Sequence, residues 1–175
     1  YQLAQQRFAG HTVSYAPLDF SWSVSTALRR IRPELLVLVE LELWPNLIRV
    51  ASERRVKIAI VNGRLSENSF RGYRRLERLP LLGGQVSATL RRIDRVAAQN
   101  ETYAERFRTL GAPRVEMTGS MKFDGAITDR DNPLSRQLAK QGGYRSDHCA
   151  FLAGSTQDPE EALALQTFLA LRDEH

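Results

Sequence analysis

The sequence predicts an α/β fold built on a Rossmann-like, doubly wound parallel sheet. Short apolar runs alternate five times with stretches in which apolar residues recur at helical spacing. Gly or Pro separates several of these segments, as expected where strands and helices end. Of the 175 residues, 42% are hydrophobic, which is enough for a packed core.

The run Leu35 to Val39, LLVLV, is the central element of this prediction. Five consecutive apolar residues are typical of a parallel strand that is buried on both faces. Glu40 and Glu42 follow it, and Pro45 opens a helix. Because ligands of parallel α/β sheets bind beyond the carboxyl ends of the strands, the two carboxylates lie where chemistry is expected.

The other elements follow from caps, breakers and periodicity. Asp19 is expected to cap the second helix, Ser66 to begin a helix that Pro80 interrupts, and Asn100 to cap the helix after the fourth strand. We expect strands over residues 12–16, 35–39, 57–61, 95–99 and 114–118, and helices over residues 1–8, 19–32, 45–54, 66–79, 85–93 and 101–110.

The pattern changes after residue 120. Residues 1–120 are expected to form one domain, residues 121–147 a polar linker with a short helix at 134–140, and residues 148–175 the start of a second α/β domain. That start comprises a buried strand at 149–154, which makes Cys149 an inert core residue, and an amphipathic helix at 159–171. Since the first helix has no cap before Tyr1, we expect the chain to be a piece of a longer protein.

The composition limits the kinds of ligand and site that this chain could have. Residues 1–125 carry 20 Lys and Arg against 12 Asp and Glu, whereas residues 126–175 carry 5 against 8. Residues 1–125 therefore carry a net positive charge that favours binding of anions. Phosphorylated lipid, nucleic acid and phosphorylated metabolites are all anions and are equally compatible with this charge. The single cysteine excludes an internal disulfide, and the three histidines are too scattered to indicate a metal site. The apolar runs are far shorter than the roughly 20 residues that cross a bilayer.

In a parallel sheet the strand exits meet at one edge, where they form the candidate site. On an extended backbone Glu40 and Glu42 would point the same way and could supply a base or hold a sugar's hydroxyls. The alternative is that they only complement the positive end of the next helix. The expected members of the site are Glu40, Glu42, Asn62, Arg64, Gln99, Asn100, Thr118, Gly119, Ser120, Lys122, Gly154, Ser155 and Thr156.

Two groups of donors at this edge could bind an anion. Arg64, Lys122 and the turn at residues 118–120 could hold a phosphate or carboxylate, and so could residues 154–156 before the last helix. Ordinary turn chemistry with solvated side chains is the alternative for both groups, and from the motifs alone it is favoured. The arginines at 71, 74, 75, 78, 91 and 92 could meet an anionic membrane, or form a solvated helix face. They lack the interleaved aromatic residues of single-stranded nucleic-acid platforms.

Taken together, the motifs resemble one family, the 3-deoxy-D-manno-octulosonic acid (Kdo) transferases of lipopolysaccharide biosynthesis. The matching stretches occur in the family's order across nearly the whole chain. They are YAPLD (15–19), VELELWPNL (39–47), VNGRLS (61–66) with Ser69 and residues 72–73, AQNE (98–101) with residues 105–107 and 110–112, TGSMKFD (118–124), and AGST (153–156) with residues 160–161.

The resemblance implies a GT-B glycosyltransferase that moves Kdo from CMP-Kdo to a lipid A precursor without a metal or other cofactor, at the cytoplasmic face of the bacterial inner membrane. The anionic membrane surface would be a partner and nucleic acid would not. Residues 1–120 would then belong to the acceptor domain, lacking its first strands, and residues 148–175 would begin the CMP-sugar domain. Because the strand at residues 12–16 would pair with one of the missing strands, we expect it to be unpaired or detached from the ladder that links the other four. Ser66 joins the substrate-binding candidates, and the main catalytic base would lie outside this chain, which alone would be inactive.

Two departures from the family pattern qualify these implications. Leu41 stands where the family usually has Thr between the two glutamates, and Gln157 stands where it has His. The second departure leaves any role of an imidazole at that edge without a residue to perform it. From the residues alone, a non-catalytic nucleotide- or anion-binding α/β module stays an alternative, and a nucleic-acid binder driven by the basic first part is a weaker one.

Overall fold

The computed structural model describes residues 1–80, 83–129, 131–145 and 147–172. The chain divides into two compact units, Tyr1–Ala126 and Ile127–His175, and each is described by itself. The first unit contains the sheet and most of the helices.

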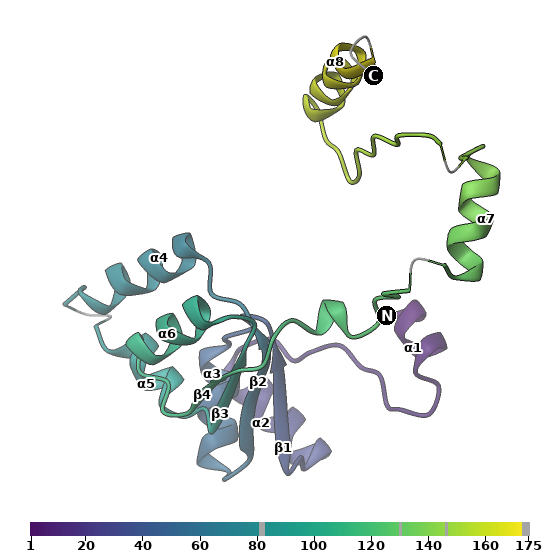
Figure 1. Ribbon diagram of the computed structural model, residues 1–175. Coiled ribbons are helices and arrows are strands. Elements are labelled where there is room, and N and C mark those ends of the chain that lie inside the picture. Colours follow the sequence, from purple (N-terminus) through teal and green to yellow (C-terminus); the bar gives the residue numbers. More distant parts are fainter. Residues whose placement is uncertain (81–82, 130, 146, 173–175) are drawn as a thin grey trace. The chain divides into compact units, whose positions relative to one another are not determined.

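Within the described residues, the sheet has four parallel strands in the order β1-β2-β3-β4 (Figure 1). The strands are β1 (Leu35–Val39), β2 (Lys57–Gly63), β3 (Arg95–Ala98) and β4 (Val115–Met117). Val37 pairs with Ala59 across β1 and β2, and the ladder continues through β3 to β4. The parallel, Rossmann-like sheet and the four linked strands predicted from sequence are therefore confirmed.

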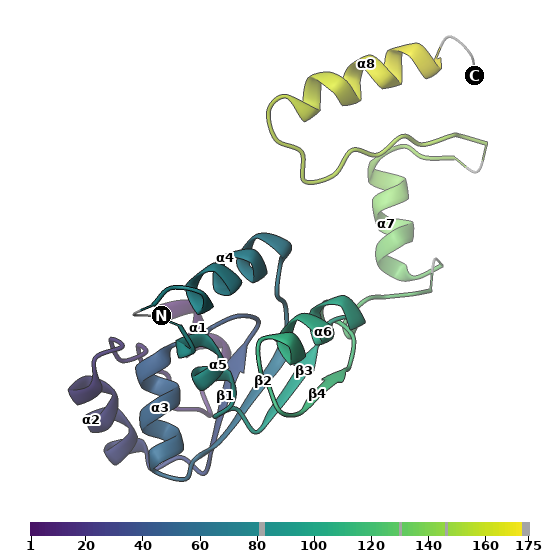
Figure 2. The same cartoon turned by 90° about the vertical axis from the view of Figure 1, so that its left-hand side faces the viewer.

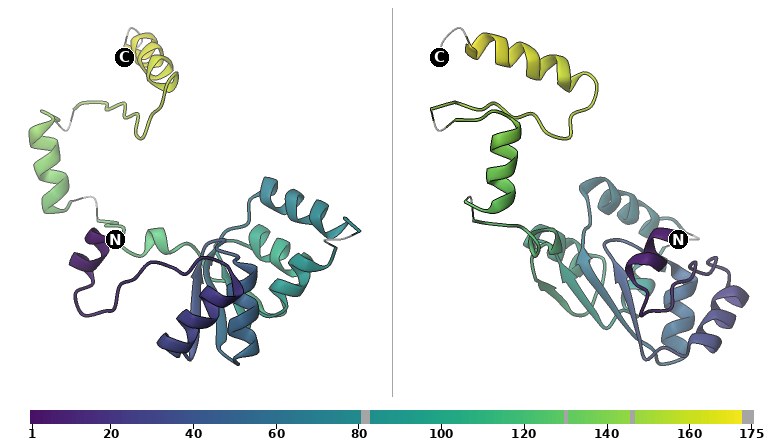
Figure 3. Two further views of the ribbon diagram at one scale, coloured as in Figure 1. Left: turned by 180° about the vertical axis from the view of Figure 1, so that it is seen from behind. Right: turned by 90° about the vertical axis from the view of Figure 1, so that its right-hand side faces the viewer.

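Helices connect these strands as predicted, with boundaries shifted by a few residues. The helices of the first unit are α1 (Gln2–Arg7), α2 (Ser21–Ile31), α3 (Pro45–Glu53), α4 (Glu67–Glu77), α5 (Gln85–Leu90), α6 (Glu101–Thr109) and the short 3₁₀ helix η1 (Met121–Phe123). Successive strands are added in one direction, so right-handed crossovers place α3, α5 and α6 on the same face of the sheet. Figure 2 looks at that face, and the right-hand view of Figure 3 looks from the opposite side.

One hydrophobic core lies between this face and the helices. It joins Leu38, Ile58, Ile60 and Val96 of the strands to apolar residues of α2, α3, α5 and α6, including Phe107. The alternate residues of β1 are not covered, since Leu35, Val37 and Val39 are 54%, 46% and 46% exposed. The prediction that this strand is buried on both faces is wrong for the described residues, because the crossovers between the described strands all run the same way and their helices cover one face.

Two further predictions in the first unit concern residues 12–19. Residues 12–16 are unpaired and lie outside the ladder of β1 to β4, as expected, but they do not form a regular strand. Asp19 does not cap α2, whose N-cap is Phe20. Its carboxylate instead accepts hydrogen bonds from the backbone N–H groups of Asn46 (3.1 Å) and Leu47 (2.8 Å), so it caps α3 from 27 residues away.

The described residues of the second unit form two helices, α7 (Pro133–Gln141) and α8 (Glu160–Arg172), at the predicted places. The strand predicted at 149–154 is absent and Cys149 is exposed rather than buried, because no strand among the described residues pairs with this segment. The apolar side chains of α8 are spread around its circumference, so the prediction of an amphipathic helix is also wrong. Among the described residues, no helix combines the length and the apolar character that crossing a bilayer requires.

Candidate active site

The carboxyl ends of β1 to β4 form one edge of the sheet, called here the carboxyl edge. Glu40, the first residue after β1, donates its backbone N–H to the carbonyl oxygen of Val61 (3.0 Å). Its own carbonyl oxygen accepts from the N–H of Arg64 (3.5 Å). The exits of β1 and β2 are thus held together, as the parallel sheet predicted.

The two glutamates do not share an extended backbone. Glu40 has a φ of 60°, in the left-handed region, so the chain turns there and the expectation that both side chains point the same way is not supported. Glu42 is exposed, and its carboxylate accepts a hydrogen bond from the Trp44 indole (2.8 Å). Glu40 is half-buried, and among the hydrogen bonds and ion pairs of the described residues none involves its carboxylate. Glu40 is therefore the better placed of the two to meet a substrate.

Asn62, expected to contact substrate, is instead buried at the centre of the carboxyl edge. It is 4% exposed, and its side-chain oxygen accepts from the N–H of Met121 (3.2 Å). Its backbone carbonyl oxygen accepts from the side-chain amide of Gln99 (3.2 Å). Asn62 therefore links the exits of β2, β3 and β4, and Gln99, half-buried, is part of that link.

The segment after β4 supplies exposed donors. Thr118 donates its N–H to Ala98 (2.9 Å), and Gly119 has a φ of 87°, which glycine adopts without strain. The hydroxyl of Ser120 accepts from the N–H of Lys122 (3.4 Å) at the start of η1. The side chains of Lys122 and Arg64 are exposed, and neither makes a hydrogen bond or ion pair within the described part of the chain. Both cations are thus open to an anionic ligand.

Ser66 and Asn100 have local structural roles. The Ser66 hydroxyl accepts from the N–H of Ser69 (3.3 Å) at the start of α4, and the Asn100 side chain accepts from the N–H of Tyr103 (2.9 Å) at the start of α6. These are the caps that the sequence indicated. Capping accounts for both side-chain oxygens.

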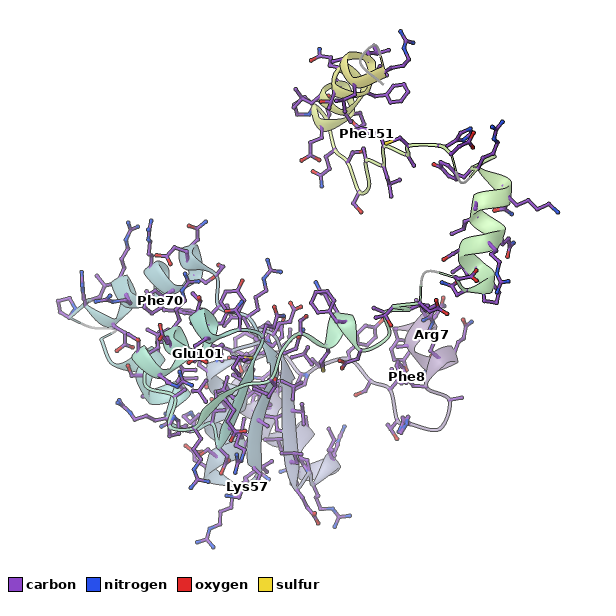
Figure 4. The ribbon with its side chains drawn as sticks, in the orientation of Figure 1. Arg7, Phe8, Lys57, Phe70, Glu101 and Phe151 are labelled. Carbon is purple, nitrogen blue, oxygen red and sulfur yellow. The ribbon has the colours of Figure 1, made fainter. Side chains whose placement is uncertain are left out.

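Arg106 supports the site, although sequence reasoning gave it no role. Its guanidinium donates to the carbonyl oxygen of Leu65 (2.8 Å) and pairs with Glu67. It also lies over the rings of Phe70 (5.9 Å) and Tyr103 (5.8 Å). Figure 4 labels Phe70 on α4 and Glu101 at the start of α6, the two helices that this arginine joins. One signal was available in the sequence, because residues 105–107 are among the stretches that match the family pattern.

Electrostatic features of the site follow from these side chains. Glu40 and Glu42 bring negative charge to the exit of β1, and Arg64 and Lys122 bring positive charge to the exits of β2 and β4. A carboxylate can accept a proton from a hydroxyl, and the cations can hold a phosphate. Among the described residues, no group of three or more His, Cys, Asp and Glu side chains is arranged to hold a metal ion.

Comparison with known proteins identifies the family. Residues 1–125 match the family model described as 3-deoxy-D-manno-octulosonic-acid transferase (kdotransferase). The chain belongs to the Kdo transferase family. This match covers the residues of the carboxyl edge from Glu40 to Lys122.

Curated relatives agree with this membership. A bifunctional glycosyltransferase/methyltransferase of Fusobacterium nucleatum is 33% identical over 163 residues, which cover 92% of this chain and 24% of that protein. The 3-deoxy-D-manno-octulosonic acid transferase of Haemophilus influenzae is 30% identical over 160 residues, 90% of this chain and 35% of that protein. The corresponding transferase of Bordetella pertussis is 30% identical over 159 residues, 91% of this chain and 35% of that protein. The chain thus spans about a quarter to a third of these relatives' length.

The last candidates, Gly154, Ser155 and Thr156, lie in the second unit of this Kdo transferase chain. Ser155 has a φ of 57°, and Gly154 and Ser155 are exposed. At Gln157, where the family pattern has His, the backbone N–H donates to the Glu160 carboxylate (3.0 Å). Participation of residues 154–156 in the same site stays a prediction.

Proposed function

We propose that the complete protein containing this chain is a glycosyltransferase that moves Kdo from CMP-Kdo to a lipid A precursor. The observation that carries the proposal is the carboxyl edge of a chain of the Kdo transferase family, where a half-buried glutamate follows β1 and two exposed cations, without a hydrogen bond or ion pair among the described residues, follow β2 and β4. The names of the relatives supply the sugar, which the geometry alone would not identify.

The proposed chemistry divides between the two charges. Transfer to a hydroxyl needs a group that accepts the hydroxyl proton and donors for the phosphate of the departing CMP. We assign Glu40 to the acceptor side, either as a base or as the group that orients the acceptor hydroxyl. Arg64 and Lys122, with the turn at residues 118–120, are assigned to anionic groups of the substrates. Glu42 is assigned to hold the Trp44 side chain in place, through the observed hydrogen bond.

The remaining partners follow from the substrates. CMP-Kdo is proposed as donor substrate, and no cofactor is invoked. The lipid A precursor carries phosphates on a membrane, and the basic surplus of residues 1–125 suits that acceptor and an anionic membrane surface, here the cytoplasmic face of the bacterial inner membrane. No role is proposed for nucleic acid.

The test is transfer of labelled Kdo by the complete protein carrying Glu40→Gln or Glu42→Gln. We expect Glu40→Gln to lower kcat by about 10²-fold or more, and Glu42→Gln to lower it less, while the thermal midpoint of unfolding stays close to that of the unchanged protein. Glu53→Gln is the matched control, because Glu53 ends α3 in an exposed ion pair with Arg49. Binding of CMP without any transfer by the unchanged protein would favour the alternative of a non-catalytic nucleotide-binding module.

A further inference from the structure

Asn62 is buried and holds neighbouring backbone in place, which is the position of a structural residue and not of one that contacts a ligand. It is the buried polar residue of the described chain, at 4% exposure, next to the end of β2. Its φ of 53° is in the left-handed region, which asparagine tolerates better than most side chains do. Its side-chain oxygen is engaged by Met121, 59 residues later.

A local irregularity of the sheet creates this position. Ile60 pairs with Val96 and Gly63 pairs with Ala98. From the first pair to the second, β2 advances by three residues and β3 by two, so β2 contains one extra residue. An extra residue of this kind bends the strand and re-aims a side chain, and such bulges are frequent beside active sites. At this bulge, Gln99 donates two hydrogen bonds to the backbone of β2. Its side-chain amide donates to the carbonyl oxygen of Asn62, and its backbone N–H donates to the carbonyl oxygen of Gly63.

The segment that Asn62 holds, residues 118–123, is kept in place by few contacts. Residues 121–123 are exposed and contribute no buried side chain. Met121 is the first residue of η1, so its N–H has no hydrogen-bond partner within that helix. The side-chain oxygen of Asn62 accepts this hydrogen bond instead. The N–H of Thr118, which donates to the carbonyl oxygen of Ala98, also ties residues 118–123 to the sheet. Removing the Asn62 oxygen therefore frees the segment that carries Ser120 and Lys122.

We propose that Asn62 is a positioning residue: it sets the placement of Ser120 and Lys122 by capping η1 from the end of β2, and does not itself contact substrate. This inference rests on the proposed function for the role of Lys122. The tether itself is independent of any reaction.

The first arm of the test measures the tether directly. Asn62→Gly keeps the left-handed backbone conformation without strain and removes the side-chain oxygen. In the complete protein, we expect backbone amide hydrogen exchange in a peptide covering residues 118–124 to become about tenfold faster. Asn62→Asp retains an oxygen acceptor and should restore slow exchange. Arg55→Gly is the matched control, because Arg55 also has a left-handed φ, 61°, but precedes β2 at the opposite end of the sheet.

The second arm measures Kdo transfer by the same variants. We expect Asn62→Gly to lower kcat by about 10²-fold, Asn62→Asp to recover most of it, and Arg55→Gly to leave it unchanged. Slow exchange at residues 118–124 in Asn62→Gly would overturn the proposal. An Asn62→Asp variant that regains slow exchange but stays as inactive as Asn62→Gly would also overturn it, since Asn62 would then act on substrate through its amide N–H groups. Absence of transfer by the unchanged protein would refute the proposed function and leave the exchange arm to decide the tether.

Discussion

At the scale of single residues, this protein uses side chains from distant parts of the sequence to complete its helix ends. Asp19 caps α3 through the N–H groups of Asn46 and Leu47, and Asn62 caps η1 through Met121. Backbone N–H groups in the first turn of a helix need partners, and the residue immediately before the helix does not always supply them. At α3 that residue is Trp44, which has no side-chain acceptor.

The capping role of Asp19 predicts a stability loss. We expect Asp19→Ala to lower the free energy of unfolding by about 1 kcal/mol, because two N–H groups at the start of α3 lose their acceptor. Asp19→Asn keeps one acceptor oxygen and should lose less. Urea unfolding monitored by circular dichroism measures the difference, and equal stability of Asp19→Ala and the unchanged chain would contradict the assignment.

A second residue prediction concerns pH. The Lys57 ammonium (2.8 Å) and the N–H of Ile58 (2.9 Å) hold the pKa of the Asp94 carboxyl below its usual range. Lys57, labelled in Figure 4, lies at the amino end of the sheet. Because the folded-state pKa is depressed, the stabilisation is complete above the unfolded-state pKa of about 4 and is lost as the pH falls through the folded-state value.

The measurement compares the unchanged chain with Asp94→Asn. We expect the unchanged chain to be more stable at pH 6, and the difference to shrink steadily below pH about 4. Lys57→Met should reduce the pH dependence without abolishing it, since the N–H of Ile58 still donates. A difference that stays constant down to pH about 2 would show that Asp94 does not contribute in this way.

At the scale of elements, β1 differs from the strand at the other edge. Its sequence is entirely apolar, as in an interior strand of a parallel sheet, yet it lies at the edge with Leu35, Val37 and Val39 about half exposed. At the opposite edge, β4 carries Glu116, which pairs with Arg95. Beside β1 lies an apolar hollow of about 940 Å³, lined in part by Tyr15, Trp22 and Ile31 of the segments before it.

An exposed apolar edge strand favours association between copies of the 175-residue chain. We expect the chain to self-associate at micromolar concentration and Val37→Lys to reduce that association without loss of helical circular dichroism. Sedimentation velocity measures the size distribution. Leu38→Lys is the contrasting variant, because Leu38 faces the core at 6% exposure and its replacement should unfold the chain. A monomeric unchanged chain would contradict the expectation.

At the scale of the whole molecule, the family match and the carboxyl edge concern one part of a larger relative. The chain covers 35% of the Haemophilus influenzae transferase, and the matched model covers residues 1–125. In the proposed reaction the groups that bind CMP are expected in the donor domain, of which residues 148–175 would be the start.

We therefore expect the 175-residue chain to transfer no Kdo from CMP-Kdo to a lipid A precursor under conditions in which the complete protein does so. Thin-layer separation of labelled lipid product measures both. The control is a mixture of the chain with the complete protein, which shows that the chain does not inhibit the assay. Measurable transfer by the chain alone would show that its own residues suffice for catalysis.

The sequence by itself determined the order of the four paired strands and of the helices between them, the caps at Ser66 and Asn100, and the family, because these depend on local patterns or on motifs in a set order. Only the tertiary structure decided that Asn62 faces inward, that Glu40 turns the chain, and that residues 149–154 are not a strand. The physical reason is that strand pairing, burial and remote caps require partners far away in the sequence, such as Met121 for Asn62. Local sequence patterns predict which kinds of interaction a residue can make, and the tertiary structure determines which of them it makes.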